Sequence, residues 1–316
     1  MAEFNIYDAA QAAQMIKDEI QERYNDFNTL NVVVIGKTGV GKSTLINTVF
    51  GDSVAEVGIG TPVTQAIRKL EKEGVPLAIY DTPGLELQGN HSTENLLEEV
   101  SELINEGIRH NDVNQAIHCI WYCINTTSSR IEPTEMDFLR KLGENTKRCN
   151  VPVILVLTQA FSKKKTEEMV MVIRKANLPI REVVPVLAQD YEISEDFPKI
   201  PAFGIDKLVE VMNKLLPDTV RDTFVALQIV SIDLKRERAR AVVTGAAGAA
   251  ALTGAAPIPF SDAAILVPTQ VSMLAGITAV FGLPLGKSAL TSIVTATIGT
   301  AGTTILGKTV VANLVK

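Results

Sequence analysis

A run of nine residues at 36–44 constrains the fold more than any other feature of this sequence. It fits the pattern G-x-x-x-x-G-K-[ST] at every fixed position. The apolar, β-branched run Asn31–Ile35 precedes it and is typical of a buried strand, while residues 43–50 after it suit a helix. This context predicts a phosphate-binding loop in an α/β fold. The residues of this phosphate loop are Gly36, Lys37, Thr38, Gly39, Val40, Gly41, Lys42, Ser43 and Thr44.

The composition of the loop explains why it suits a polyphosphate. Glycines allow successive backbone N–H groups to turn inward, and the following helix adds the positive end of its dipole. We expect the Lys42 ammonium to contact the β- and γ-phosphates and to be a catalytic group. The Ser43 hydroxyl is a candidate ligand of Mg²⁺. The sequence therefore predicts a nucleoside triphosphate and Mg²⁺ as ligands.

A second motif, Asp81-Thr-Pro-Gly84, follows a predicted strand at 75–80. Asp81 is a candidate Mg²⁺ ligand, usually through a water, and the N–H of Gly84 is placed to sense the γ-phosphate. Asp-x-x-Gly alone is common in turns, but its position after a strand makes it more specific. A small-molecule kinase more often has an arginine-bearing lid, so the motif favours a hydrolase.

These motifs resemble the translation-factor-related class of P-loop GTPases, in its Era-like and septin-like branch. The run His118–Ile124 resembles the fourth strand of that branch. The N-terminal helix that leads into the first strand resembles immunity-related GTPases. The tail around Gly254–Asp262 resembles an uncharacterised Ala/Gly-rich C-terminal domain found on bacterial Era-like GTPases.

The resemblance implies GTP binding, Mg²⁺-dependent hydrolysis and a loop threonine that closes over the metal and the γ-phosphate. Thr64 is favoured for this role over Thr61, although both also suit an ordinary turn. Thr64 and Gly84 therefore join Lys42 as catalytic candidates. Leu85 occupies the place of the glutamine that orients water in Ras-like enzymes, so we expect slow turnover until a partner or second copy supplies the missing group. His91 is either a water-positioning residue or a solvated loop residue.

The base-recognition motif departs from the family pattern [NT]-K-x-D. Thr158 matches, but Gln159 replaces the lysine and Phe161 replaces the aspartate that accepts hydrogen bonds from guanine. Ala188 remains a candidate to offer its N–H to the guanine O6. GTP is favoured over ATP by the rest of the resemblance, and adenine remains an alternative.

Strands and helices are predicted to alternate along the first two thirds of the chain, which indicates a mostly parallel sheet covered on both faces. We expect an N-terminal amphipathic helix in residues 1–29, a GTPase domain in 30–217 and an apolar helical domain in 218–316. Predicted strands are 31–35, 66–72, 75–80, 116–124, 151–157 and 183–187. Predicted helices are 3–28, 43–50, 94–110, 133–143, 163–177, 204–216 and 218–240.

The last 76 residues contain only four charged side chains, and two interpretations of this tail remain open. The stretches 263–281 and 288–306 are each close to the ~20 residues that span a bilayer, but proline, glutamine and many threonines oppose insertion. Alternatively, the tail is a helical layer whose small residues allow close packing. Four cations before it suit either an anionic membrane surface or a solvated helix face. These are Lys235, Arg236, Arg238 and Arg240.

The overall composition limits the expected partners and cellular location of the protein. The net charge of −6 disfavours broad nucleic-acid binding. The three cysteines suit free thiols in a reducing cytoplasm, and the N-terminus lacks a secretory signal, so we expect a cytoplasmic protein, with peripheral or integral membrane contact left open. GTP or GDP and a second copy of the chain are the expected partners. A switch, a membrane-assembling scaffold GTPase and a binding-only protein remain alternatives.

Overall fold

The computed structural model describes ten parts of the chain, which fall into two compact units. One unit is Asn28–Ser231, and the other combines Met1–Phe27 with Ile232–Lys316. Each unit is described by itself. The described residues are 18–20, 22–23, 25–51, 61–63, 67–72, 74–82, 93–128, 131–194, 198–254 and 272–282.

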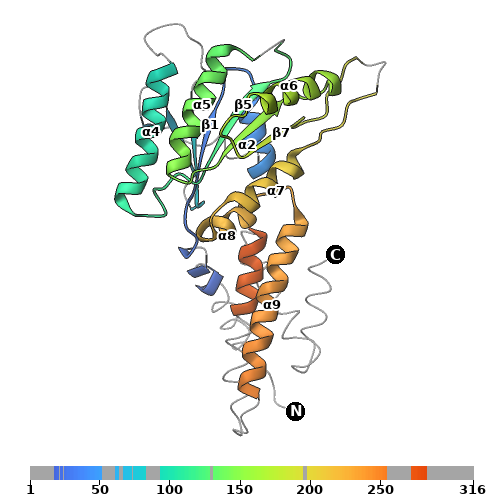
Figure 1. Cartoon of the computed structure of the whole chain (residues 1–316). Coiled ribbons are helices and arrows are strands. Elements are labelled where there is room, and N and C mark those ends of the chain that lie inside the picture. The colour runs from blue at the N-terminus through green and yellow to red at the C-terminus, as the bar shows by residue number, and fades with distance from the viewer. Residues whose placement is uncertain are drawn as a thin grey trace. The chain divides into compact units, whose positions relative to one another are not determined.

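A seven-stranded sheet in the order β2-β3-β4-β1-β5-β6-β7 forms the centre of the unit Asn28–Ser231 (Figure 1). The five strands from β4 to β7 in this order are parallel, whereas β3 runs antiparallel to both β4 and β2. The predicted α/β fold with a mostly parallel sheet is confirmed. The strands are β1 (Leu30–Ile35), β2 (Thr61–Pro62), β3 (Arg68–Glu71), β4 (Leu77–Asp81), β5 (Cys119–Asn125), β6 (Val153–Thr158) and β7 (Glu182–Pro185).

Helices cover both faces of this sheet. Val33 and Ile35 of β1 share a core cluster with α4, α5 and α6. On the other face, Trp121 of β5 stacks on Phe50 of α2 at 5.9 Å between ring centroids, and Phe50 also meets a ring of α8. Because β1 is buried on both faces, all six of its residues are buried, as the apolar run predicted. The helices are α2 (Lys42–Phe50), α4 (Thr93–His110), α5 (Pro133–Arg148), α6 (Lys163–Lys175), α7 (Ile205–Leu215) and α8 (Asp218–Leu227).

The predicted single helix over 218–240 is wrong, because α8 ends at Leu227 and α9 begins at Ile232. Gln228 causes the break. Its fully buried side chain accepts hydrogen bonds from the N–H groups of Val230 (2.9 Å) and Ser231 (2.7 Å), and donates to the Ser231 carbonyl at 2.9 Å. These side-chain hydrogen bonds stabilise a tight turn and replace the backbone hydrogen bonds that would continue the helix. The turn separates α8, in the sheet unit, from α9, in the other.

The second unit contains α9 (Ile232–Gly254) and a helix at 272–281. In the part of the chain that the structure describes, no helix combines the length and the apolar character needed to cross a bilayer. The predicted helix at 3–28 is seen only where residues between 18 and 25 are described. The stretch 288–306 and the first part of 263–281 lie outside the described residues.

One of the four cations proposed for an exposed basic face is buried instead. The side chain of Lys235 is only 7% exposed, and its ammonium donates to the Phe281 carbonyl at 3.2 Å, near the end of the helix at 272–281. A cation suits this place because the last carbonyls of a helix carry partial negative charge. Arg236 forms an ion pair with Asp233 at 3.2 Å, while Arg238 and Arg240 are exposed.

The buried lysine predicts a pH dependence of stability. Burial lowers the pKa of Lys235 to about 8, so between pH 8 and the unfolded value near 10.5 the unfolded chain binds more protons. The free energy of unfolding should therefore rise with pH across this window, by about 2–3 kcal/mol at pH 10. Lys235→Met should lose this rise. Thermal unfolding followed by circular dichroism at pH 7.5 and 10 compares the two proteins, and an equal pH response would contradict the prediction.

Candidate functional site

The phosphate loop connects the carboxyl end of β1 to the first turn of α2. Gly39 and Gly41 have positive φ angles of 75° and 95°, which glycine adopts without strain. Gly36 is restricted for another reason, because a Cβ there would lie 2.6 Å from the Cys123 carbonyl oxygen of β5. The start of the loop therefore lies close to β5, and the loop ends at a helix whose first turn has no acidic residue. Such a helix N-terminus is a site for an anion.

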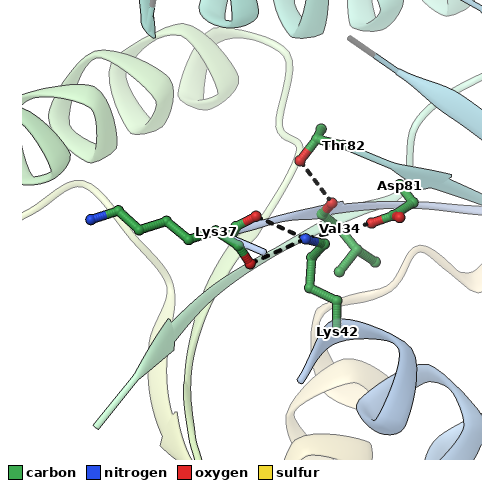
Figure 2. Close-up of polar contacts among 6 residues, drawn as sticks. Val34, Lys37, Lys42, Asp81 and Thr82 are labelled. Atoms are coloured by element: carbon green, nitrogen blue, oxygen red, sulfur yellow. Dashed lines mark hydrogen bonds and ion pairs between the residues drawn. The ribbon is translucent and has the colours of Figure 1, made fainter. Parts of the chain in front are cut away.

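Lys42 starts α2, and its side chain folds back over the loop. Its ammonium donates to the carbonyls of Gly36 at 2.8 Å and Lys37 at 3.4 Å (Figure 2). The side chain is only 10% exposed, and its Nζ lies 4.0 Å from Oδ1 of Asp81. The Lys42 ammonium is thus held over the loop, between the loop carbonyls and the carboxylate of Asp81 in the neighbouring strand β4. A positive charge at this place can neutralise a phosphate.

Asp81 ends β4, which pairs in parallel with β1 and so brings its carboxylate to the phosphate loop. Its Oδ1 is buried and has no hydrogen-bond partner in the described structure. Burial raises the pKa of Asp81, and the positive charges of Lys42 and Arg68 oppose this rise. The next residue, Thr82, is anchored by a hydrogen bond from its N–H to the Val34 carbonyl at 3.1 Å (Figure 2 shows the second bond, from its hydroxyl).

These residues fit a magnesium ion bound with a nucleotide. Mg²⁺ is commonly held by one or two protein oxygens, with waters and substrate phosphates completing its shell. Ser43, exposed in the first turn of α2, would supply a hydroxyl, and Oδ1 of Asp81, which lacks a hydrogen-bond partner, would supply a carboxylate oxygen. Thr64 is the third predicted ligand and lies outside the described residues.

Gln159 follows β6 and reaches the phosphate loop, a contact that the sequence did not indicate. Its Nε2 donates to the Gly39 carbonyl at 3.2 Å, and its Oε1 accepts a hydrogen bond from Asn125 at 2.9 Å. The Thr126 hydroxyl holds the Gln159 carbonyl at 2.7 Å. Asn125 and Thr126 were missed by sequence reasoning, although a polar pair at the carboxyl end of a buried strand is a usable signal. Thr158 instead bonds within the sheet, donating to the Ile124 carbonyl at 3.2 Å.

Phe161 lies in the loop after β6, where the family pattern has an aspartate. Its ring stacks on Tyr191 with 4.5 Å between centroids and an interplanar angle of 7°. Tyr191 is 40% exposed, so the pair forms part of the surface of the sheet unit. Ala188 lies half-buried beyond β7, next to the bridge between Leu187 and Phe203.

The other predicted residues of the phosphate loop differ in their exposure to solvent. Val40 is buried and its N–H contacts the Lys37 carbonyl at 3.4 Å, whereas Thr38 is exposed and Thr44 is half-buried. The predicted positions Gly84, Leu85 and His91 fall outside the described residues. Thr61, the alternative to Thr64, lies in the short edge strand β2.

Residues 31–159 match the family model described as the 50S ribosome-binding GTPase. This match covers less than half of the chain, and it includes the phosphate loop, Asp81 and Thr158. The predicted resemblance to a P-loop GTPase is therefore confirmed for this region. The resemblance of the tail to an Ala/Gly-rich domain stays a prediction.

Curated relatives of this chain include septins. Neuronal-specific septin-3 of Rattus norvegicus is 28% identical over 169 residues, which cover 46% of this chain and 46% of the relative. Septin-9 of Mus musculus is 29% identical over 139 residues, covering 36% of this chain and 23% of the relative. The chain thus spans about half the length, or less, of the relatives it matches. Among solved structures, Toc33 from Arabidopsis thaliana in complex with Mg²⁺ and GMPPNP is 19% identical, with a TM-score of 0.37, over 68% of this chain and 92% of that one.

Proposed function

We propose that this protein binds GTP together with Mg²⁺ and hydrolyses the terminal phosphate, acting as a switch whose turnover rises on self-association or with a partner. The observation that carries the proposal is the convergence of Lys42 and Asp81 at the phosphate loop, with their charged atoms 4.0 Å apart. A cation and an orphaned carboxylate oxygen at one helix N-terminus match a magnesium–triphosphate complex. The GTPase family match over the same residues supports guanine as the base.

In the proposed mechanism, the chain contributes positioning and charge neutralisation. The N–H groups of the loop hold the β-phosphate, and the Lys42 ammonium takes charge that builds up on the transferred phosphoryl group. Ser43, Asp81 and Thr64 would hold Mg²⁺, and the ion when bound would neutralise negative charge on the phosphates. The N–H of Gly84 would sense the γ-phosphate and link its presence to the loop that follows.

Leu85 cannot orient a water by hydrogen bonding, so we expect the isolated chain to turn over slowly. An arginine supplied in trans is worth about 10³–10⁵ in rate in related phosphoryl transfers. Self-association is therefore a suitable trigger. The test measures phosphate release per site at rising protein concentration, with GTP and Mg²⁺. A turnover that stays constant across a wide concentration range argues against activation by self-association. Absence of Mg²⁺-dependent GTP binding would remove the whole proposal.

The second candidate is a scaffold GTPase that assembles on membranes. It is favoured by the septin relatives and by the exposed Arg238 and Arg240 on α9. Anionic vesicles added to the same assay distinguish the two. Acceleration by lipid favours the scaffold, whereas acceleration by protein concentration alone favours the switch. Binding without measurable release in either condition would leave a nucleotide-binding protein with negligible hydrolysis.

The base site provides a further prediction. Phe161 offers no acceptor for the N1–H and 2-amino groups of guanine, so Phe161→Asp should raise the GTP-over-ATP affinity ratio by about tenfold through charge-assisted hydrogen bonds. Competition binding with GTP, ATP and XTP on the unmodified chain and the variant measures this ratio. Phe161→Leu is the matched control, since it removes the stack on Tyr191 without adding a carboxylate. Equal ratios in the aspartate and leucine variants would show that the base does not contact this position.

A further inference from the structure

Lys37 belongs to the phosphate loop, but its side chain leaves the site. Figure 2 shows it extending away from Lys42. Its ammonium lies 3.2 Å from Oε2 of Glu132 and 3.8 Å from Oε2 of Glu135, at the start of α5. A lysine in a phosphate-binding loop would add a second positive charge to the site. In this structure the carboxylates of Glu132 and Glu135 hold the Lys37 ammonium outside the phosphate site.

Glu135 is an unusual partner because it is buried. The residue is only 9% exposed, and the hydroxyl of Tyr122 lies 3.3 Å from its Oε1. Tyr122 is fully buried in β5. Burial raises the pKa of Glu135, and the positive charge of Lys37 is the largest effect that opposes this rise. A buried carboxylate that loses its cation is strongly disfavoured, so the Lys37 ammonium is needed where it lies.

Lys37 also contacts Lys42 through its backbone. The backbone carbonyl of Lys37 accepts a hydrogen bond from the Lys42 ammonium at 3.4 Å. The loop around it contains Gly39 and Gly41, which have no side chains to hold their conformation. A shift of the Lys37 backbone would therefore move both the loop N–H groups and the cation that faces the phosphates.

We propose that Lys37 and Glu135 form a positioning pair, in which the ion pair ties the phosphate loop to α5 and thereby sets the nucleotide affinity of the site. This inference rests on the proposed function. The pair acts through the loop backbone and Lys42, and its side chains do not touch the nucleotide. Glu132 is 51% exposed and adds little, because solvent screens exposed ion pairs.

Fluorescent GTP analogue titrations of the full chain with Mg²⁺ test the pair. Lys37→Met should weaken affinity by about tenfold, which is within the range of coupling between contacting residues. Lys37→Arg keeps the cation and should restore affinity to within about twofold of the unmodified chain. Glu132→Gln is the matched control, since it removes the exposed carboxylate next to the buried one, and it should bind like the unmodified chain.

Glu135→Gln separates positioning from structural support. The amide keeps an acceptor for the Tyr122 hydroxyl but removes the charge that binds Lys37. Because the buried charge is removed, the melting temperature should stay equal or rise while affinity falls. A merely structural residue would lower both together. The double variant with Lys37→Met should bind no more weakly than Lys37→Met alone, because both changes break one interaction.

The outcomes separate this inference from the proposed function. If the unmodified chain shows no Mg²⁺-dependent affinity for the GTP analogue, the proposed function and the positioning pair are both wrong. If it binds and Lys37→Met binds equally well, the positioning pair alone is overturned. Losses in the two single variants that add in the double variant would overturn it as well. Should Lys37→Met unfold, Glu135→Gln decides, and unchanged affinity in that folded variant overturns the inference.

Discussion

Lys42→Ala is expected to weaken Mg²⁺-dependent GTP binding on the order of 100-fold and to remove hydrolysis. In the proposed function the Lys42 ammonium faces the phosphates, and a hydrogen bond between charged groups contributes about 1.5–3 kcal/mol. The loss should appear both in the dissociation constant and in single-turnover phosphate release, because the interaction strengthens as charge builds up in the transition state. Isothermal titration calorimetry with GTP, with and without Mg²⁺, measures the binding effect.

Two controls make this result specific. Lys214→Ala removes an exposed lysine from α7 in the same unit and should leave binding unchanged. Melting temperatures of both variants establish that each is folded. A folded Lys42→Ala variant that keeps its triphosphate affinity would show that the loop does not bind phosphate, and the proposed function would be wrong.

The positions of the main elements follow from sequence because their signals are local. The β-branched run of β1 and the glycine pattern after it are contiguous, so strand, loop and helix start within a few residues of their predicted bounds. The parallel arrangement of β1 and β4 then places Asp81 beside Lys42 without further information. This part of the site is predictable because topology alone brings its two halves together.

The rest depends on contacts between distant residues. Gln228 breaks the predicted helix at 218–240 through hydrogen bonds whose energy depends on its complete burial, which no local pattern reveals. The sequence pattern around Lys235 is typical of a solvated cation, but its ammonium donates a hydrogen bond to the carbonyl of Phe281, 46 residues away. The contact of Lys37 with Glu135 likewise joins residues nearly a hundred positions apart. Side chains of this kind have two plausible environments, and only the tertiary structure chooses between them.

His118, a buried histidine immediately before β5, should make the protein less stable in mild acid. His118 is 5% exposed, and its Nδ1 accepts a hydrogen bond from the Asn31 N–H at 3.0 Å. Protonation of Nδ1 would break this bond, and burial lowers the pKa of His118 to about 4 from 6.5. Between these values the unfolded chain binds the proton more tightly, so the stabilisation is complete above pH 6.5 and is lost as pH falls toward 4.

The expected size follows from the shift, since one pKa unit corresponds to 1.36 kcal/mol, which gives about 3 kcal/mol in total and about 2 kcal/mol by pH 5. His118→Asn keeps an acceptor near the Asn31 N–H but does not titrate, so its free energy of unfolding should fall less between pH 7.5 and pH 5. Urea denaturation reports this difference through the single tryptophan, Trp121, which is fully buried in β5. His110→Asn is the matched control, because His110 is exposed at the end of α4 and its loss should not alter the acid response. If the unmodified chain and His118→Asn lose stability in parallel, His118 does not link folding to protonation, and other groups carry the acid sensitivity.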